Sequence, residues 1–225
     1  MKILFLLLPL FTFGQIVNKQ LINIEIGVPF FNDLTSNNKE YTLGVAYINR
    51  FSESFSFETF YHFASSSEFP EFYGNQQETL NFYNELLPEV SEDPSSLAFY
   101  SLWHKINAHF LGVRIHYSFI NSNRWYLSFN IGGGLYNGKS SYNSLDELIF
   151  STEIGKITAY SEILTTKTET KFFFSPSIHT FYRFHKKLHI GLNFDLYSIP
   201  IKSGVTDIPV SGDHYNVSLT LGHSF

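Results

Sequence analysis

The sequence contains no cysteine among its 225 residues, and only one methionine and two tryptophans. Without cysteine, neither a disulfide framework nor a thiolate metal site can form. Positive charge is also scarce, because 15 Lys and Arg stand against 20 Asp and Glu, a net charge of −5. Nucleic-acid binding requires a basic face. We therefore expect no nucleic-acid partner.

Long apolar runs are missing as well, since no stretch reaches the 18 or more residues of a membrane-spanning helix. A shorter apolar segment, residues 3–13, follows Lys2 and precedes Gly14-Gln15. A positive start, an apolar core too short to span a bilayer and a small residue at its end are typical of a secretory signal peptide. We expect residues 1–14 to be a cleaved signal peptide, with an uncleaved anchor as the alternative, and residues 15–225 to form one domain.

Aromatic residues are abundant, with 25 Phe and 14 Tyr, and both types favour β-strands. Apolar and polar residues alternate with period two in eight segments of about ten residues each. Strands with one apolar and one polar face have this pattern. The eight segments are residues 21–28, 41–47, 54–63, 109–119, 125–135, 171–184, 188–196 and 215–225.

The connections between these segments fall into two classes. Those after the second, fourth and sixth segments are short (49–52, 120–124 and 185–187). Those after the first, third, fifth and seventh are long (29–39, 65–102, 138–168 and 200–212). Strict alternation of short and long links is typical of an up-and-down barrel in a membrane. Within the long links we expect a helix over 76–87, a weaker helix beginning at 144–147, and an extension of the sixth strand over 165–170.

Periodicity alone does not say whether the apolar face points toward lipid or, as in a lipocalin-like soluble barrel, inward. Three features favour lipid: the polar face carries charges of both signs, the chain ends in Phe225, and aromatic residues gather at strand ends, as they do at membrane interfaces. These aromatics are Phe51, Phe55, Phe119, Trp125 and Phe184 near the short turns, and Tyr41, Phe63 and Trp103 near the long loops. We predict an all-β fold: an eight-stranded antiparallel up-and-down transmembrane β-barrel.

The last segment, Tyr215 to Phe225, alternates apolar residues and closes on Phe225. It is similar to the signal that the barrel-assembly machinery reads in outer-membrane β-barrel families. With the leader and the eight segments, the chain resembles small eight-stranded outer-membrane β-barrel proteins, and Gly14-Gln15 and the aromatic-rich strands resemble those of Bacteroidota-type bacteria. The resemblance is architectural and indicates no subfamily. It implies a bacterial outer-membrane location, contact with outer-membrane lipid, and assembly by that machinery with Phe225 as the candidate signal.

Charged and histidine residues on the polar faces form a candidate polar network in the barrel lumen. Charges enclosed in a narrow barrel must be paired or hydrated, and side chains fill the interior of an eight-stranded barrel. We therefore expect a plug of paired side chains rather than a pore. The candidate residues are Glu25, Glu58, Arg114, His116, Lys171, His179, Arg183 and Asp195.

Three other motifs have weaker functional interpretations. His116 and Ser118 resemble the His-x-Ser pair of a lipid A deacylase family, in which His is the base and Ser the nucleophile. They lie on the polar face beside a short turn, and Phe119 stands where that family has Asn, so we interpret them as a hydrogen-bonded lumen pair. The acidic link 65–102 is interpreted as solvated, with divalent-cation binding as the alternative. Residues 132–134 are three glycines inside a strand and not a phosphate loop.

We expect a non-enzymatic outer-membrane barrel with a structural or surface-interaction role and long loops facing outside. The alternatives are a narrow channel or carrier for small or apolar solutes and, third, a lipid-modifying enzyme. No catalytic, cofactor-binding or metal-binding residues are expected. The sequence does not identify an external partner.

Overall fold

The computed structural model describes residues 19–31, 39–68, 75–86, 101–122, 124–199 and 214–225. The expected signal peptide lies outside these residues. Among the described residues, no helix is long and apolar enough to cross a membrane. The elements are β1 (Lys19–Phe31), β2 (Lys39–Arg50), β3 (Phe55–Glu68), helix α2 (Gln76–Leu86), β4 (Ser101–Asn121), β5 (Trp125–Ser151), β6 (Lys156–Arg183), β7 (Leu188–Tyr197) and β8 (His214–Ser224).

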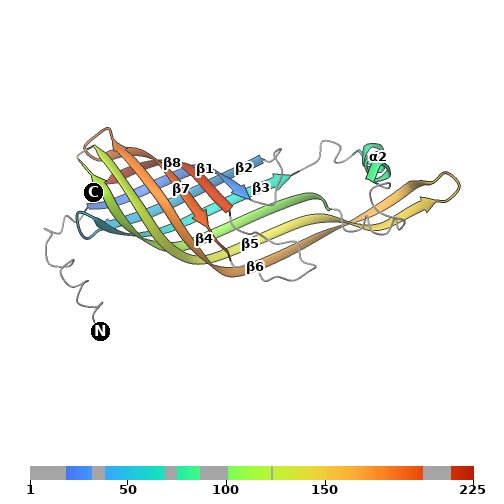
Figure 1. The fold of residues 1–225 in the computed structure, drawn as a ribbon, viewed down its shortest axis with the longest axis horizontal. Helices are drawn as coiled ribbons and strands as arrows, with labels where there is room; N and C mark the ends of the chain where they lie inside the picture. Colours follow the sequence, from blue (N-terminus) through green and yellow to red (C-terminus); the bar gives the residue numbers. More distant parts are fainter. Residues whose placement is uncertain (1–18, 32–38, 69–74, 87–100, 123, 200–213) are drawn as a thin grey trace.

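The eight strands form a closed barrel in which each strand pairs antiparallel with the next and β8 pairs with β1 (Figure 1). Closure gives every strand two neighbours, so backbone donors and acceptors are satisfied without water. The links from β2 to β3, β4 to β5 and β6 to β7 are short, as predicted. The C-terminus lies at the same end as these short turns (Figure 1).

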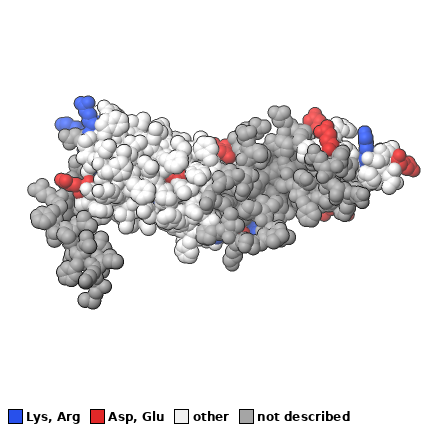
Figure 2. Space-filling model, in the orientation of Figure 1, with Lys and Arg blue, Asp and Glu red and all other residues white. Residues whose placement is uncertain are grey.

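Apolar and polar side chains alternate between the outside and the inside of the barrel wall, as predicted from the sequence. On β4, Leu111 and Ile115 are 60% and 56% exposed, whereas Arg114 and His116 between and beside them are buried. Charged side chains are sparse on the barrel face shown in Figure 2 and gather toward the ends. A wall that exposes aliphatic side chains and encloses charges is stable where hydrocarbon, not water, surrounds it. The apolar face therefore points outward.

The β5–β6 hairpin differs from the prediction. Residues 138–168 were expected to form a loop with a helix beginning at 144–147, but β5 and β6 pair from Trp125↔Tyr182 to Ser151↔Lys156. The helix prediction was wrong, because residues 144–149 pair with 159–163 of β6, and this cross-strand pairing outweighs a weak local capping pattern. The predicted extension over 165–170 is confirmed. The hairpin continues well past the other strands (Figure 1).

The predicted helix over 76–87 is confirmed as α2, which lies beside this hairpin (Figure 1). His109, a polar residue on the lipid-facing side of β4, lies near the long-loop rim. Its Nδ1 is 2.8 Å from the Tyr61 hydroxyl, and its ring lies 5.0 Å from that of Phe63. An imidazole at the interface is thus accommodated by an aromatic neighbour and a hydrogen bond.

Candidate functional site: the barrel interior

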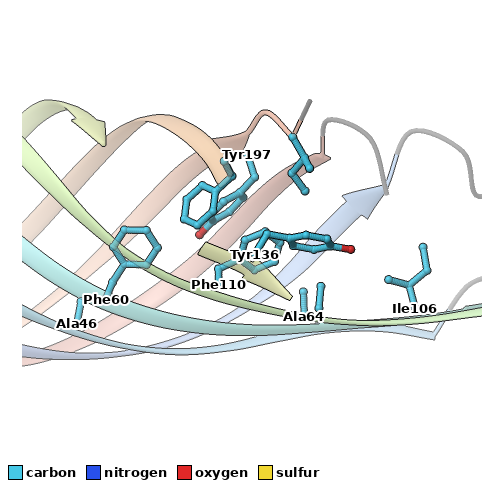
Figure 3. Close-up of a cluster of buried hydrophobic side chains, with 10 residues drawn as sticks. Ala46, Phe60, Ala64, Ile106, Phe110, Tyr136 and Tyr197 are labelled. Atoms are coloured by element: carbon cyan, nitrogen blue, oxygen red, sulfur yellow. The ribbon is translucent and has the colours of Figure 1, made fainter. Parts of the chain in front are cut away.

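The barrel interior consists of three layers. Toward the long loops lies an apolar layer that includes Phe60, Phe110, Tyr136 and Tyr197 (Figure 3). Toward the short turns lies a smaller apolar layer made by Leu21, Ile48, Tyr126 and Phe181. The charged residues of β3, β4, β6 and β7 lie between the two, at 0–1% exposure. At this level the described side chains leave no water-accessible surface on the charged groups.

Arg114 is the centre of the polar layer. Its Nη1 donates to Glu58 Oε1 at 3.1 Å and lies 3.0 Å from Asp195 Oδ1. Its Nη2 donates to Ser175 Oγ at 2.9 Å and to the Tyr197 hydroxyl at 3.2 Å. The guanidinium carbon lies 3.9 Å from the centroid of the Phe60 ring. One planar fork therefore joins β3, β4, β6 and β7, which a lysine's point charge cannot do equally well.

Two histidines face the second oxygen of Glu58. His116 Nε2 lies 2.9 Å and His179 Nδ1 lies 3.7 Å from Glu58 Oε2. The other nitrogen of His179 lies 3.2 Å from Asp195 Oδ1. The other nitrogen of His116 lies 3.4 Å from the Tyr126 hydroxyl and 3.5 Å from Ser128 Oγ. Glu58, His116 and His179 thus each have a polar partner for one side-chain atom, while a second atom of each faces the same small region.

Glu25 belongs to a neighbouring group of polar side chains. Its Oε2 lies 3.2 Å from His62 Nε2 and accepts a hydrogen bond from Ser218 at 3.3 Å. His62 Nδ1 pairs with the Tyr197 hydroxyl. His62 and Tyr197 were not in the candidate network, although His62 stands at a polar-face position of β3. Tyr197 gave no sequence signal, because it lies one residue past the expected end of the seventh strand.

The structure brings six of the eight candidate residues together and places two elsewhere. Lys171 pairs with Glu169 above the closed part of the barrel, because β6 there has passed beyond the end of β7. Arg183 lies at the opposite end, beside Arg50 near the short turns. Neither reaches the central layer. The six that lie in it are Glu25, Glu58, Arg114, His116, His179 and Asp195.

The His-x-Ser pair points into the interior. His116 and Ser118 are both buried, and His116 faces Glu58 rather than the lipid-exposed wall. Acyl transfer to or from a membrane lipid requires the nucleophile at the outer surface of the barrel. The pair therefore does not have the placement that the deacylase chemistry needs.

Glycine makes room for the large polar side chains. A Cβ on Gly132 of β5 would overlap the Val113 carbonyl oxygen and the Arg114 side chain. A Cβ on Gly44 of β2 would overlap the His62 ring. These two glycines allow the Arg114 side chain and the His62 imidazole to approach the wall of a narrow barrel closely.

Outside the barrel, α2 packs against the tip of the β5–β6 hairpin. The Asn84 side chain accepts from the Ile157 N–H at 2.8 Å and donates to its carbonyl at 3.1 Å, as a neighbouring strand would. Tyr83 is fully buried and stacks edge-on against Tyr160 at 5.4 Å. Burial, and then the nearby Glu162 carboxylate, raise the pKa of the Tyr83 phenol well above its ordinary value. Helix and hairpin are thus one packed unit.

The candidate assembly signal, Phe225, ends the chain beside β1. Its backbone N–H donates to the Gln20 carbonyl at 2.9 Å, and its ring is 62% exposed and lies 4.8 Å from that of His223. An exposed aromatic at the barrel end leaves the ring accessible to another molecule.

A closed eight-stranded barrel with an apolar wall and an enclosed polar layer has the fold of the outer-membrane β-barrel proteins. No family model matches the sequence, and no curated protein matches it either. Two solved structures share the fold at a TM-score of 0.51, with 92% of this chain and 99% of the other chain covered. One is the attachment invasion locus protein Ail of Yersinia pestis, solved in complex with the heparin analogue sucrose octasulfate, at 8% identity. The other is a major outer membrane protein of Thermus thermophilus, at 10% identity.

Proposed function

We propose that this protein is a non-enzymatic barrel of the bacterial outer membrane that acts at the cell surface through its long β5–β6 hairpin and α2. Lipid of the outer membrane would contact the apolar wall of the barrel, and the barrel-assembly machinery would recognise the strand that ends in Phe225. The aromatic-rich strands support a place among the Bacteroidota-type barrels. The external partner is a macromolecule or surface that the hairpin reaches.

The observation that carries this proposal is the contrast between the closed interior of the barrel and the structure that extends beyond it. The interior is closed by a buried charged layer between two apolar layers. The exterior has a ribbon whose pairing runs from Gly138↔Glu169 to Ser151↔Lys156, and a helix is packed on it. A barrel with an enclosed interior and a rigid extension is built to support contacts outside the membrane rather than to pass solutes.

Electrical recording separates this proposal from the channel alternative. We expect the purified protein to show no conductance above background in planar bilayers, because buried ion pairs block the lumen. Steady conductance from the unmodified protein that changes when Glu58 is replaced by glutamine would favour the channel instead.

Deletion of the hairpin tests the surface role. In the variant, Gly138 is joined to Glu169 by a two-residue turn, which removes residues 139–168 and keeps the β5–β6 pairs from Trp125↔Tyr182 to Gly138↔Glu169. Cells that display this variant should lose the adhesion to surfaces and to other cells that the full chain confers, while the protein keeps its heat-modifiable gel mobility. Tyr83→Ala, which keeps the hairpin but loosens α2, is the matched variant that tests the helix separately. Unchanged adhesion in the deletion variant would contradict the proposal.

A further inference from the structure

The buried group formed by Glu58, His116 and His179 contains three polar atoms that face one another and have no hydrogen bond. Within the described part of the chain, no hydrogen bond reaches Glu58 Oε2, His116 Nε2 or His179 Nδ1. His116 Nε2 lies 2.9 Å from the oxygen, which is within ion-pair distance. All three side chains are 0% exposed. Buried polar atoms are rarely left unpaired, because burial without a partner removes the hydrogen bonds that water would provide.

The distances between these atoms match those between the ligands of one metal ion. Tetrahedral ligands at zinc bond lengths of about 2.0–2.1 Å lie roughly 3.3 Å apart. Glu58 Oε2 lies 2.9 Å from His116 Nε2 and 3.7 Å from His179 Nδ1, and all three atoms lie within 4.8 Å of one another. An ion bound by all three atoms would lie among them, away from the straight line between any two.

The outer partners of the three side chains also fit a metal site. Histidine ligands usually donate their other ring N–H to a carboxylate or another acceptor, which fixes the ring. His179 has Asp195 in this position, and His116 has Tyr126 and Ser128. Glu58 has its other oxygen held by Arg114. Each ligand is therefore oriented before an ion binds.

Charge balance in the layer favours a cation. The central layer contains three carboxylates, of Glu25, Glu58 and Asp195, and the one guanidinium of Arg114 among the described residues. With neutral histidines, two negative charges remain uncompensated in an enclosed region, where unpaired charge is costly. One divalent ion would neutralise them.

A second group, Glu25, His62 and Asp195, also has ligand atoms close together. Glu25 Oε1 and His62 Nε2 have no hydrogen bond either, but Asp195 is engaged: its Oδ1 lies 3.0 Å from Arg114 and 3.2 Å from His179, and its Oδ2 accepts from Asn216 at 3.3 Å. A cation there would displace the guanidinium. The first group can hold an ion without displacing Arg114, so the observations favour it.

We propose that Glu58, His116 and His179 bind one divalent transition-metal ion, best fitted by Zn²⁺, inside the barrel. Two imidazoles and one carboxylate select zinc-like ions over Mg²⁺ and Ca²⁺, which prefer oxygen ligands. The ion joins β3, β4 and β6 across the lumen. Because apolar layers lie on both sides, it enters as the barrel closes and is then kinetically trapped.

The test is metal retention by the full chain, unfolded, refolded into detergent with Zn²⁺, and dialysed against EDTA. The unmodified protein should retain about one zinc per chain by elemental analysis, whereas Ca²⁺ or Mg²⁺ is not retained. His116→Gln and Glu58→Gln should lower the zinc content at least about tenfold. His189→Gln is the matched control, because His189 is buried near the short turns and bonds to Asn23 instead; it should keep the metal. Heat-modifiable mobility identifies the variants that have folded.

A second measurement needs no variant. X-ray absorption of the zinc-loaded protein should show nitrogen and oxygen ligands at about 2.0–2.1 Å with imidazole scattering. Less than about a tenth of a zinc per folded chain would overturn the proposal and indicate that protonated histidines balance the charge. Loss of zinc in His62→Gln but not in His116→Gln would overturn it as well, by moving the ion to the second group.

Discussion

Replacing Arg114 by methionine removes the one guanidinium from the central layer while keeping most of the side-chain volume. The change leaves Glu58 and Asp195 without their cation, at 3.1 and 3.0 Å in the native protein, and Ser175 without its donor. Hydrogen bonds to charged groups each contribute about 1.5–3 kcal/mol. Breaking a buried ion pair by removing one partner costs about 3–5 kcal/mol. We expect the free energy of unfolding to fall by roughly 4 kcal/mol, a large part of the usual total.

The assay is urea unfolding of the protein in lipid vesicles, followed by tryptophan fluorescence and by gel mobility of the folded form. Arg114→Lys keeps the charge but loses the planar fork, so its loss should be smaller, about 1–2 kcal/mol. Adding Glu58→Gln to the methionine variant should recover part of the loss, because one uncompensated charge is removed. A methionine variant within about 1 kcal/mol of the unmodified protein would refute the view that Arg114 holds the layer together.

Three further changes test other parts of the structure. Gly132→Ala should destabilise the barrel by about 1–3 kcal/mol in the same urea assay, because the added methyl group crowds the lumen. Gly155→Ala at the exposed hairpin tip should affect only the tip, at about 1 kcal/mol. Equal effects of the two changes would contradict the packing described for Gly132. Ile115→Arg on the apolar wall should lower the free energy of unfolding in lipid vesicles by about 2–4 kcal/mol. Thr168→Arg, on the hairpin beyond the barrel, should leave it nearly unchanged. A tolerated arginine at position 115 would mean that lipid does not cover this face. Asn84→Ala should weaken the docking of α2 on the hairpin by about 1–2 kcal/mol. Hydrogen exchange should then be faster for the amides of α2 and unchanged for those of the barrel strands. Faster exchange throughout the barrel would contradict local docking.

Much of the barrel was predictable because its cause is local. Side chains on a strand alternate between two faces, so the eight alternating segments and the three short turns were visible without knowing which strands pair. The helix over 76–87 was also visible, since its apolar spacing is local. Most of the hairpin beyond residue 138 was not, apart from the extension over 165–170. Its segments lack the alternation of the barrel wall, and their strand conformation comes from pairing with each other.

The lumen was predictable as a class but not as a set of contacts. Polar-face positions identified Glu58, His116, His179 and Asp195, yet also Lys171, which has the same alternation but lies past the closed barrel. The same reasoning found no metal-binding pattern, because the three proposed ligands come from three strands and share no sequence spacing.

The sequence by itself determined the number of strands and which residues share an apolar or a polar face, because both follow from a period-two pattern along each strand. That the apolar face meets lipid was predicted from other features: the charges on the polar face, Phe225 and the aromatics at strand ends. Only the tertiary structure decided which charges meet. The partners of Arg114 lie on β3, β6 and β7, and their approach depends on the register of every strand pair around the barrel. A shift in the β3–β4, β4–β5 or β5–β6 register would move Glu58, His116 and His179 apart without changing the pattern of a single strand.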